Sequence, residues 1–483
     1  MARAKSDNVL LPHQTDGTAF LRSNKYAALF DEQGLGKSKQ VIDAIGAEIE
    51  AGNLRGALIA CPNGLKSTWA AEIERFSSLS YAVFGAGRKA RRTAFRSLRA
   101  AFYVINYEAV ETELASLRAL LRFKPMAFVL DESHRIKTPA AKVTKAILKL
   151  RSDATRRYLL SGTPVANKPD DLWSQIFFLD GGESLGSTPE QFRSRYGSSR
   201  GYKNVDDLRE QLSTFSMRRL KERTIQLPPK NASRVHIDLG GHQRVMYDKM
   251  RNELALWVTT LDGEQVLKQA EVILARLVRL AQLASNPGLL DAGYHEAPAK
   301  FTALDDLLTT HIDQRSQKAI VWTSFVGNIE TLQMRYSQYH PVTLFGEMKT
   351  PERDRAVQAF RSDETVRLLV ANPAAAREGL TLTEANVAIY LDRTFNLVDY
   401  LQSQDRIHRI SQTRPCEIVL LLANATIDQF IDYSLEQKHR LARFVQKDSE
   451  TIGPADLTLS KPELMRALLW PSDGSTTHDQ PAG

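Results

Sequence analysis

Cysteine is scarce in this sequence. The chain of 483 residues holds 2 cysteines, Cys61 and Cys416, and no Cys-x-x-Cys pair. This scarcity excludes a disulfide framework and a zinc site built on cysteines, because both need several thiols at short spacings. Each cysteine is expected to be a small buried side chain in a reducing compartment.

Long apolar runs are also absent. No stretch reaches the about 18 apolar residues of a membrane-spanning helix, so no membrane partner is expected. The first residues, MARAKSDNVLLPHQ, lack the apolar core of a secretory signal. We therefore expect a cytoplasmic protein, nucleoid-associated in a bacterium or in the host cytoplasm for a virus. The sequence shows no zinc-finger spacing and no helix-turn-helix, the modules that recognise particular DNA sites. If the protein acts on specific sites, protein partners would have to select them.

A strong charge of one sign is missing as well. Lys and Arg total 64 and Asp and Glu total 56, which leaves a net charge of +8. This mild basic excess permits a polyanionic partner such as nucleic acid without requiring one. The hydrophobic share of 43% and the charged share of 25% are typical of a globular chain, and the length leaves room for several domains.

Short apolar segments alternate with helical stretches in two separate parts of the chain. Segments without alternating polar residues indicate buried strands, and strands separated by helices form parallel sheets covered on both faces. We therefore predict an α/β protein of two parallel-sheet lobes with helical insertions. The strands are expected at residues 26–30, 57–60, 102–105, 127–130 and 158–160, and again at 319–322, 342–345, 368–370, 387–391 and 418–422.

The lobe boundaries are predicted from a proline pair and from segments that lack strands. Helical insertions are expected at 166–225 and 242–290, and the LPPK segment at 227–230 marks a break, since paired prolines end helices and stiffen linkers. We expect an N-terminal lobe at 1–232, a C-terminal lobe at 233–450, and a short helix with a polar, disordered tail at 451–483.

The segment DEQGLGKSKQ lies between a predicted strand and an amphipathic helix, as a phosphate-binding loop does. Gly34 and Gly36 would let backbone N–H groups approach an oxyanion, and the helix N-terminus adds its positive dipole end. Lys37 would reach the β- and γ-phosphates, and the Ser38 hydroxyl would ligate Mg²⁺. Asp31 stands where this pattern usually has glycine. A glycine turn that only caps a helix is the competing interpretation.

The segment PMAFVLDESH places two adjacent carboxylates at the end of a predicted buried strand. Asp131 fits the carboxylate that holds Mg²⁺, and Glu132 fits the group that orients or deprotonates an attacking water. Two buried carboxylates are unfavourable without a cation or partner. A surface turn with a helix-capping Asp is the alternative. Both segments together, in this order, predict a site for ATP and Mg²⁺.

The segments DEQGLGKS, DESHRIK and LLSGTPVAN resemble the Swi/Snf-type ATPases of helicase superfamily two. The similarity continues in LLPHQ, VINYE, MRRLKE, KAIVWTSF, EGLTLTEAN and QSQDRIHRISQ, and it covers residues 10–440. It implies two RecA-like lobes, the first of them binding ATP, and ATP-driven translocation on double-stranded DNA. The helical inserts look closest to the annealing-helicase-like branch.

The resemblance also implies roles for single residues. Gln14 would read adenine. Gln402, Arg406 and Arg409 have the spacing of one helix face, and the resemblance makes the two arginines fingers for the γ-phosphate. A charged surface helix is the alternative. Coupling is implied for His134, Ser161, Thr163 and Gly379, and contact with the DNA backbone for Asn106, Ser324 and Thr381.

The basic segment at 87–99 leaves two interpretations open. Arg88 and Arg91 would contact DNA phosphates, or the segment is a solvated helix face. For the whole chain, the leading hypothesis is a DNA-dependent ATPase that translocates on duplex DNA and remodels DNA or protein–DNA complexes. A strand-separating DNA or RNA helicase, and an ATP-gated subunit of a defence, restriction or repair assembly, are the alternatives.

Overall fold

The computed structural model of the chain describes residues 9–85, 100–165, 168–198, 201–261, 265, 268–375 and 380–449. The chain divides into two compact units. The first unit contains Met1–Leu227 and a C-terminal piece that begins at Lys438, and the second begins at Pro228 and includes the chain up to Gln437. This division differs from the predicted lobes, because the chain from Lys438 packs on the first unit. There the guanidinium of Arg209 lies over the ring of Phe444.

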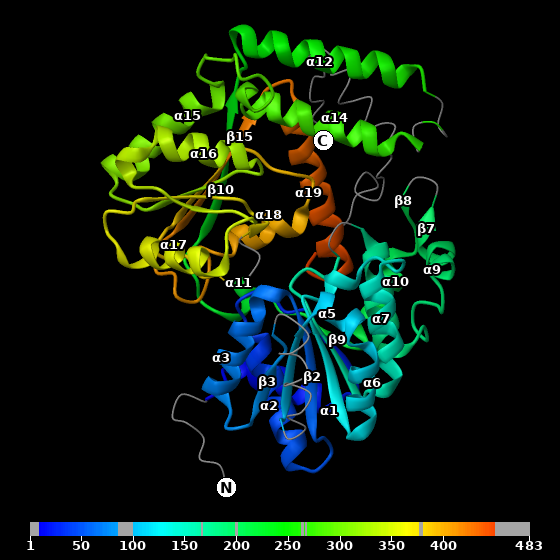
Figure 1. Cartoon of the computed structure of the whole chain (residues 1–483). Helices are drawn as coiled ribbons and strands as arrows, with labels where there is room; N and C mark the ends of the chain where they lie inside the picture. Colours follow the sequence, from blue (N-terminus) through cyan, green and yellow to red (C-terminus); the bar gives the residue numbers. More distant parts are fainter. Residues whose placement is uncertain are drawn as a thin grey trace, which may run out of the picture. The chain divides into compact units, whose positions relative to one another are not determined.

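The first unit, coloured mainly blue to cyan in Figure 1, is built on a seven-stranded sheet in the order β3-β4-β2-β5-β6-β1-β9, in which neighbouring strands are parallel. The five strands predicted for this lobe are confirmed, and β3 and β9 are additional. Their bounds are β1 Tyr26–Leu29, β2 Gly56–Cys61, β3 Tyr81–Val83, β4 Phe102–Asn106, β5 Met126–Asp131, β6 Arg156–Leu160 and β9 Ser216–Met217.

Helices cover both faces of this sheet. Val41 and Ile45 of α2 and Ile73 of α3 belong to one apolar cluster with alternate residues of the strands. On the opposite face, Phe178 of α8 packs edge-on against Phe128 of β5. The helices are α1 Pro12–Ser23, α2 Lys37–Glu50, α3 Lys66–Phe76, α5 Tyr107–Thr112, α6 Leu114–Phe123, α7 Lys142–Leu150, α8 Trp173–Asp180, α9 Pro189–Tyr196, α10 Val205–Ser213 and α11 Lys221–Thr224. The antiparallel pair β7 Gly197–Ser198 and β8 Gly201–Tyr202 interrupts the segment that was predicted to be helical.

The second unit contains a six-stranded parallel sheet in the order β10-β15-β14-β11-β13-β12. Neighbouring residues of β11 belong to two different apolar clusters, Ile320 to one and Val321 to the other, so both faces of the sheet are buried. The five predicted strands are confirmed and β10 is additional. The bounds are β10 Lys230–Ile237, β11 Ala319–Trp322, β12 Val342–Leu344, β13 Leu368–Ala371, β14 Val387–Tyr390 and β15 Cys416–Ala423.

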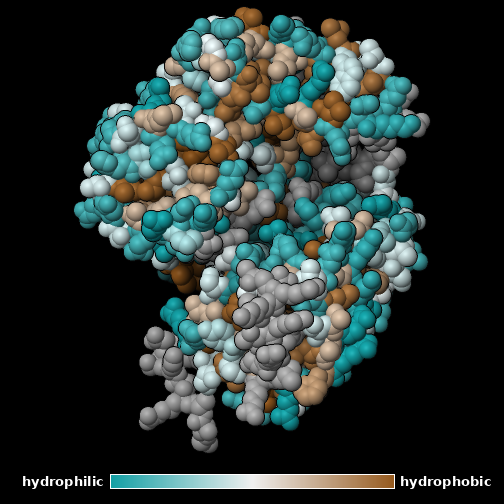
Figure 2. All heavy atoms as spheres, in the orientation of Figure 1, coloured by the Kyte–Doolittle hydropathy of each residue, from teal (hydrophilic) through white to brown (hydrophobic). Residues whose placement is uncertain are grey.

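The second unit also carries a pair of long helices. α12 and α14 lie side by side and occupy the segment where a helical insertion was predicted (Figure 1). Apolar residues of these helices are exposed, among them Val245, Leu256 and Leu274, and brown residues lie among teal ones at the top of Figure 2. The helices are α12 Gly241–Thr259, α14 Ala270–Ser285, α15 Ala299–Leu308, α16 Val326–Arg335, α17 Thr350–Ser362, α18 Leu397–Gln404 and α19 Ile427–Val445.

The two parallel sheets with helical insertions confirm the predicted fold class. Among the described residues, no helix is long and apolar enough to cross a membrane.

Candidate nucleotide site and associated residues

The loop between β1 and α2 has the backbone of a phosphate-binding loop. Gly34 and Gly36 have φ of +89° and +74°, in the left-handed region where side chains are unfavourable. A Cβ at Gly36 would lie 2.3 Å from Nε2 of Gln14, whereas a Cβ at Gly34 would meet nothing within 4 Å. Gly36 is therefore required both for its conformation and for the close approach of Gln14. The structure brings the predicted adenine reader directly to this loop.

Lys37 points back over the loop that precedes it. Its Nζ donates to the backbone oxygens of Asp31 at 2.7 Å and Glu32 at 3.2 Å. Burial lowers the pKa of Lys37, while the charges of Glu132, Asp31 and Asp131 act in the opposite direction. Nε2 of Gln33, in the same loop, donates to Oε1 of Glu132 at 3.1 Å. The two sequence segments of the predicted ATP site thus meet.

Asp31, the departure from the usual glycine, is fully buried and paired. Its carboxylate accepts hydrogen bonds from Nε of Arg219 at 3.0 Å and from Nη2 of the same guanidinium at 2.6 Å. Arg219 also donates to Oε1 of Gln40 on α2 at 2.8 Å. A two-pronged arginine contact gives a buried carboxylate its partner. Asp31 therefore fixes the loop to the segment that follows β9.

Asp131 and Glu132 lie at the carboxyl end of β5, as predicted. Nε1 of Trp69 donates to Oδ2 of Asp131 at 2.8 Å, and the Tyr107 hydroxyl donates to the backbone oxygen of Asp131 at 2.7 Å. Burial, with the charge of Glu132, raises the pKa of Asp131 to about 7. Glu132 has φ of +52°, and Nε2 of Gln33 donates to its Oε1 at 3.1 Å. A non-glycine residue in this conformation is a feature of functional sites.

The donors at this site fit Mg²⁺. Asp131 offers a carboxylate and Ser38 a hydroxyl, both hard oxygen ligands. Burial, and after it the charge of Glu132, raises the pKa of Asp131, and a bound cation would favour the ionised carboxylate against both effects. Among the described residues no cluster of three or more His, Cys, Asp or Glu side chains is placed to hold a metal. Mg²⁺ commonly takes one or two protein ligands and completes its shell with phosphates and water.

Three of the predicted coupling residues meet beside Glu132. Nδ1 of His134 lies 3.3 Å from Oε2 of Glu132 and 3.4 Å from Oγ of Ser161. The Ser161 hydroxyl in turn accepts from the backbone N–H of Thr163 at 3.2 Å. A chain of contacts thus runs from the carboxylate to the loop after β6. Gly379, the fourth predicted coupling residue, lies outside the described residues.

In the second unit, the predicted helix through Gln402, Arg406 and Arg409 is wrong in its extent. α18 ends at Gln404, and the backbone continues in a 3₁₀ turn. Its hydrogen bonds join residues three apart, from Arg406 N to Ser403 O and from Ile407 N to Gln404 O. Arg406 is buried and donates to the backbone oxygens of Gln402 at 2.9 Å and Leu380 at 3.2 Å. The turn brings both arginines to the loop that follows the undescribed residues 376–379.

The residues predicted to contact DNA are placed as follows. Asn106 ends β4, and its Nδ2 donates to Oε2 of Glu108 at 2.8 Å. Ser324 follows β11, and its backbone N–H donates to Oδ1 of Asp392 at 2.6 Å. The Thr381 hydroxyl accepts from Nη1 of Arg409 at 2.9 Å. Ser324 lines a cavity of about 190 Å³ in the second unit. Arg88 and Arg91 lie outside the described residues.

Several residues at the site were not among those predicted from the sequence. Trp69 and Gln33 donate to the two carboxylates, Tyr107 donates to the backbone oxygen of Asp131, and Arg219 pairs with Asp31. Trp69 and Tyr107 follow predicted strands, which was the available signal, since parallel strands end at one edge of a sheet. Arg219 carried no such signal because it contacts a residue far away in the sequence.

Comparison with known proteins gives two family matches. A SNF2-related domain matches residues 13–289, and a helicase conserved C-terminal domain matches residues 299–411.

Relatives come from distant organisms. A putative ATP-dependent helicase/translocase of Bacillus subtilis is 30% identical, over 89% of this chain and 48% of that protein. The chromodomain-helicase-DNA-binding protein 1-like of Danio rerio is 28% identical, over 94% of this chain and 46% of its own length. A DNA annealing helicase and endonuclease of Bos taurus is 27% identical, over 89% of this chain and 40% of its own length. The chain thus spans less than half the length of these relatives.

Among solved structures, the SWI2/SNF2 ATPase core of Sulfolobus solfataricus in complex with dsDNA matches with 27% identity and a TM-score of 0.44, over 95% of this chain and 97% of that one. Because the SNF2-related match alone covers more than half of the chain, this protein belongs to the SNF2-related family of Swi/Snf-type ATPases in helicase superfamily two.

Proposed function

We propose that this chain is a DNA-dependent ATPase of the helicase type, which translocates on double-stranded DNA and remodels DNA or protein–DNA complexes. The observation that carries the proposal is the left-handed glycine loop, over which Lys37 folds back and from which Gln33 donates to Glu132, next to Asp131, at 3.1 Å. The names of the Bacillus subtilis, Danio rerio and Bos taurus relatives, all helicases or helicase-like translocases, support the same activity.

The phosphate loop would bind ATP through its backbone and through Lys37. The Lys37 ammonium now donates to two backbone oxygens, and phosphate oxygens would compete for the same protons. Gln14 would contact adenine from its place against Gly36. Ser38 and Asp131 would hold Mg²⁺, which neutralises charge on the β- and γ-phosphates when it is bound.

Glu132 would take the proton of the attacking water. One of its carboxylate oxygens is held by Gln33, and the other faces His134, so the carboxylate is fixed in orientation. A held carboxylate can orient a water for in-line attack on the γ-phosphorus and accept its proton as the bond forms. The γ-phosphate leaves as inorganic phosphate, and ADP keeps the bridging oxygen.

In the second unit, Arg409 would link ATP hydrolysis to DNA binding. Its guanidinium donates to the hydroxyl of Thr381, which we propose contacts the DNA backbone with Asn106 and Ser324. Arg406 and Arg409 would supply positive charge to the transition state, as arginine fingers do. A phosphate contact beside a finger would make turnover depend on bound nucleic acid. Contacts to phosphates carry no sequence information, which suits a translocating enzyme.

The test is ATP hydrolysis by the purified chain without nucleic acid and with single-stranded DNA, duplex DNA and duplex RNA, at two salt concentrations. Stimulation by duplex DNA that weakens with salt is expected. Lys37→Ala and Glu132→Gln should abolish turnover, while Lys145→Ala and Glu111→Gln, exposed residues of the same unit, should not. Parental turnover in either site variant would show that the site is assigned wrongly.

Two other outcomes would redirect the proposal. Stimulation by single strands or RNA alone, with separation of a labelled duplex, would indicate a strand-separating helicase. Displacement of the third strand of a triplex without duplex separation supports translocation. Hydrolysis that needs a partner protein would indicate an ATP-gated subunit of a larger assembly.

A further inference from the structure

Arg218 binds three separate segments of the first unit with one guanidinium group. Nη1 donates to the backbone oxygen of Phe30 at 2.5 Å and to that of Gly162 at 3.0 Å. Nη2 donates to Oδ2 of Asp448 at 2.7 Å, and Nε lies 3.1 Å from its Oδ1. Phe30 precedes the phosphate loop, and Gly162 lies between the coupling residues Ser161 and Thr163. Arg218 thus joins these two loops to the chain that follows α19.

The turn that ends α19 aims the Asp448 carboxylate at Arg218. Lys447 has φ of +61°, and the backbone N–H of Asp448 donates to the oxygen of Arg443 at 2.8 Å. The N–H of Lys447 donates to the oxygen of Phe444 at 3.0 Å. A residue with left-handed backbone conformation, followed by a hydrogen bond back to the residue five positions earlier, is a common helix ending. Glycine usually occupies the left-handed position. A lysine there stores strain of about 1 kcal/mol, which the contacts of Asp448 offset.

The pair is well shielded and lies close to the reacting groups. The side chains of Arg218 and Asp448 are 15% and 3% exposed, so their attraction is weakly screened by solvent. Nη2 of Arg218 also lies 4.0 Å from Oε1 of Glu32, whose backbone oxygen accepts a hydrogen bond from Nζ of Lys37 at 3.2 Å. Gly162 is held close to the same loop, since a Cβ there would lie 3.2 Å from the backbone N of Gln33.

α19 itself belongs to two units. Its residues up to Gln437 belong to the second unit, and those from Lys438 to the first. The ring of Phe444 lies under the guanidinium of Arg209, so the C-terminal part of the helix is bound to the first unit by a cation–π contact as well as by Asp448. The pair lines a cavity of about 580 Å³, which gives this end of the helix room to change its contacts.

We propose that Arg218 and Asp448 form a latch through which the end of α19 positions the phosphate loop and the Gly162 loop for ATP hydrolysis. When Asp448 holds Arg218, the guanidinium keeps the carbonyls of Phe30 and Gly162 at a fixed distance from each other. The two loops are then fixed, and Glu132 stays aligned with the phosphates of bound ATP. When Asp448 is released, ATP still binds through Lys37, and turnover slows. Both residues are positioning residues. The inference rests on the proposed ATPase activity, and it adds a control point outside the residues that touch ATP.

The full-length protein tests the latch through kcat and KM measured separately. Asp448→Asn should lower the kcat for ATP about tenfold, with KM and the affinity for a fluorescent ATP analogue within about twofold of the parent. Asp448→Glu keeps the charge and should restore most of the rate. Asp207→Asn is the matched control, because Asp207 pairs with Arg195 at 2.7 Å in the same unit and away from both loops. It should leave kcat unchanged.

Arg218→Lys provides a second variant if Asp448→Asn melts below the assay temperature. It keeps the charge next to Asp448, but its three donors sit on one nitrogen and lack the planar fork that spans the two carbonyls and the carboxylate, so kcat should again fall with KM retained. Parental kcat in both variants would overturn the latch, as would an equal loss of kcat in Asp207→Asn. A parent that hydrolyses ATP without any response to DNA would instead contradict the proposed DNA dependence, and the latch would still be read from the basal kcat.

Discussion

At the scale of single residues, the fold strongly changes the acidity of Asp131, a group at the candidate reaction site. Burial and the Glu132 carboxylate raise its pKa from 3.8 to about 7. The native protein therefore holds a proton at pH values where the unfolded chain has released it. Protonation of Asp131 stabilises the fold fully below about pH 4, and this contribution is lost as the pH rises through about 7. Without bound metal, the ionised carboxylate is a source of instability above neutral pH.

Removing this carboxylate should flatten the pH dependence of stability. In chelator, we expect the melting temperature of the parent to fall between pH 5 and pH 8 relative to that of Asp131→Asn, as the pKa near 7 requires. Thermal unfolding at a series of pH values measures this. Asp153→Asn, at a carboxylate paired with Arg118 and Arg122, serves as the control. Parallel curves for parent and Asp131→Asn would contradict the raised pKa.

The two glycines of the phosphate loop make a matched pair. In Gly34→Ala the only cost is the strain of a side chain on a left-handed backbone, roughly 1–2 kcal/mol. Gly36→Ala suffers the same strain and also drives its Cβ into Gln14, 2.3 Å away. We therefore expect Gly36→Ala to weaken binding of a fluorescent ATP analogue far more than Gly34→Ala, in an equilibrium titration. Equal affinities would mean that Gln14 does not contribute to nucleotide binding.

Local spacing decided which of these residues could be predicted. Lys37 follows its glycines directly and Glu132 ends an apolar strand, so a short window of sequence held the signal. Arg219 lies in the MRRLKE segment that resembles the family, but its pairing with Asp31 gave no local signal, and Asp448 gave none at all, since each meets its partner through the fold. Asp31 was noticed as a departure, but its pairing with Arg219 depends on β9, a strand of 2 residues that no periodicity reveals.

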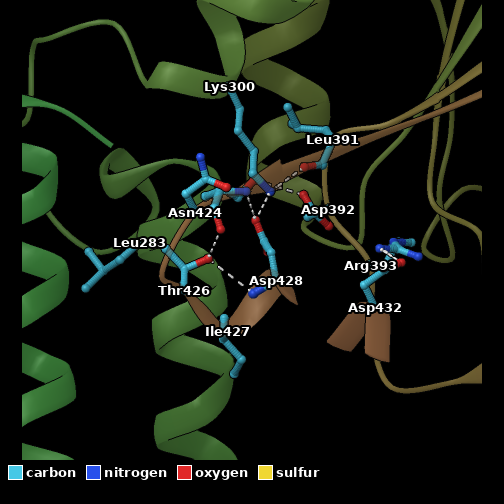
Figure 3. Close-up of polar contacts among 12 residues, drawn as sticks. Leu283, Lys300, Leu391, Asp392, Arg393, Asn424, Thr426, Ile427, Asp428 and Asp432 are labelled. Atoms are coloured by element: carbon cyan, nitrogen blue, oxygen red, sulfur yellow. Dashed lines mark hydrogen bonds and ion pairs between the residues drawn. The ribbon is translucent and has the colours of Figure 1, made fainter. Parts of the chain in front are cut away.

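At the scale of elements, a buried ion pair joins two helices of the second unit. Nζ of Lys300, on α15, lies 2.6 Å from Oδ2 of Asp428, at the start of α19, and donates to the backbone oxygen of Leu391 at 2.8 Å (Figure 3). Asp428 also accepts from the backbone N–H of Ala423 at 2.9 Å. Lys300 is completely buried, so its charge has no access to water. Losing one partner would leave the other buried and uncompensated.

Lys300→Met should therefore be strongly destabilising. Breaking a buried pair costs about 3–5 kcal/mol, which corresponds to a fall of roughly 10 °C in melting temperature for a unit of this size. Adding Asp428→Leu should recover part of the loss, because no buried charge then remains. Arg335→Met is the control, since its pair with Asp305 is 36% and 38% exposed. The prediction fails if Lys300→Met and Arg335→Met melt together.

The elements themselves were predictable where they are apolar. Nine of the ten predicted strands consist mostly of buried side chains, β12 being the exception, and each was found within a few residues of its expected ends. β10 was missed because it pairs with β15 at the edge of the sheet and exposes most of its polar sequence KNASRVHI. The helix predicted through Arg409 failed because helical spacing also occurs in a turn whose arginine side chains bond to the backbone.

At the scale of the whole molecule, the net charge of +8 is too small to predict where DNA binds. The contacts proposed for Asn106, Ser324 and Thr381 are polar and local. The strongest cationic segment, at 87–99, lies outside the described residues. The dependence of DNA affinity on salt separates real phosphate contacts from a general attraction, because each contact releases counterions.

We expect Arg88 and Arg91 to contact DNA phosphates. Each contact adds about −0.9 to the slope of log affinity against log salt concentration, so Arg88→Ala with Arg91→Ala should reduce the slope by about 2. Anisotropy of a labelled duplex over a range of KCl concentrations measures it. Arg118→Ala with Arg122→Ala removes the same charge from guanidiniums held by Asp153 at 3.1 Å and 2.6 Å, and should leave the slope unchanged. An unchanged slope in the first double variant would mean that the segment is a solvated helix face, while equal reductions in both would mean that DNA responds only to net charge.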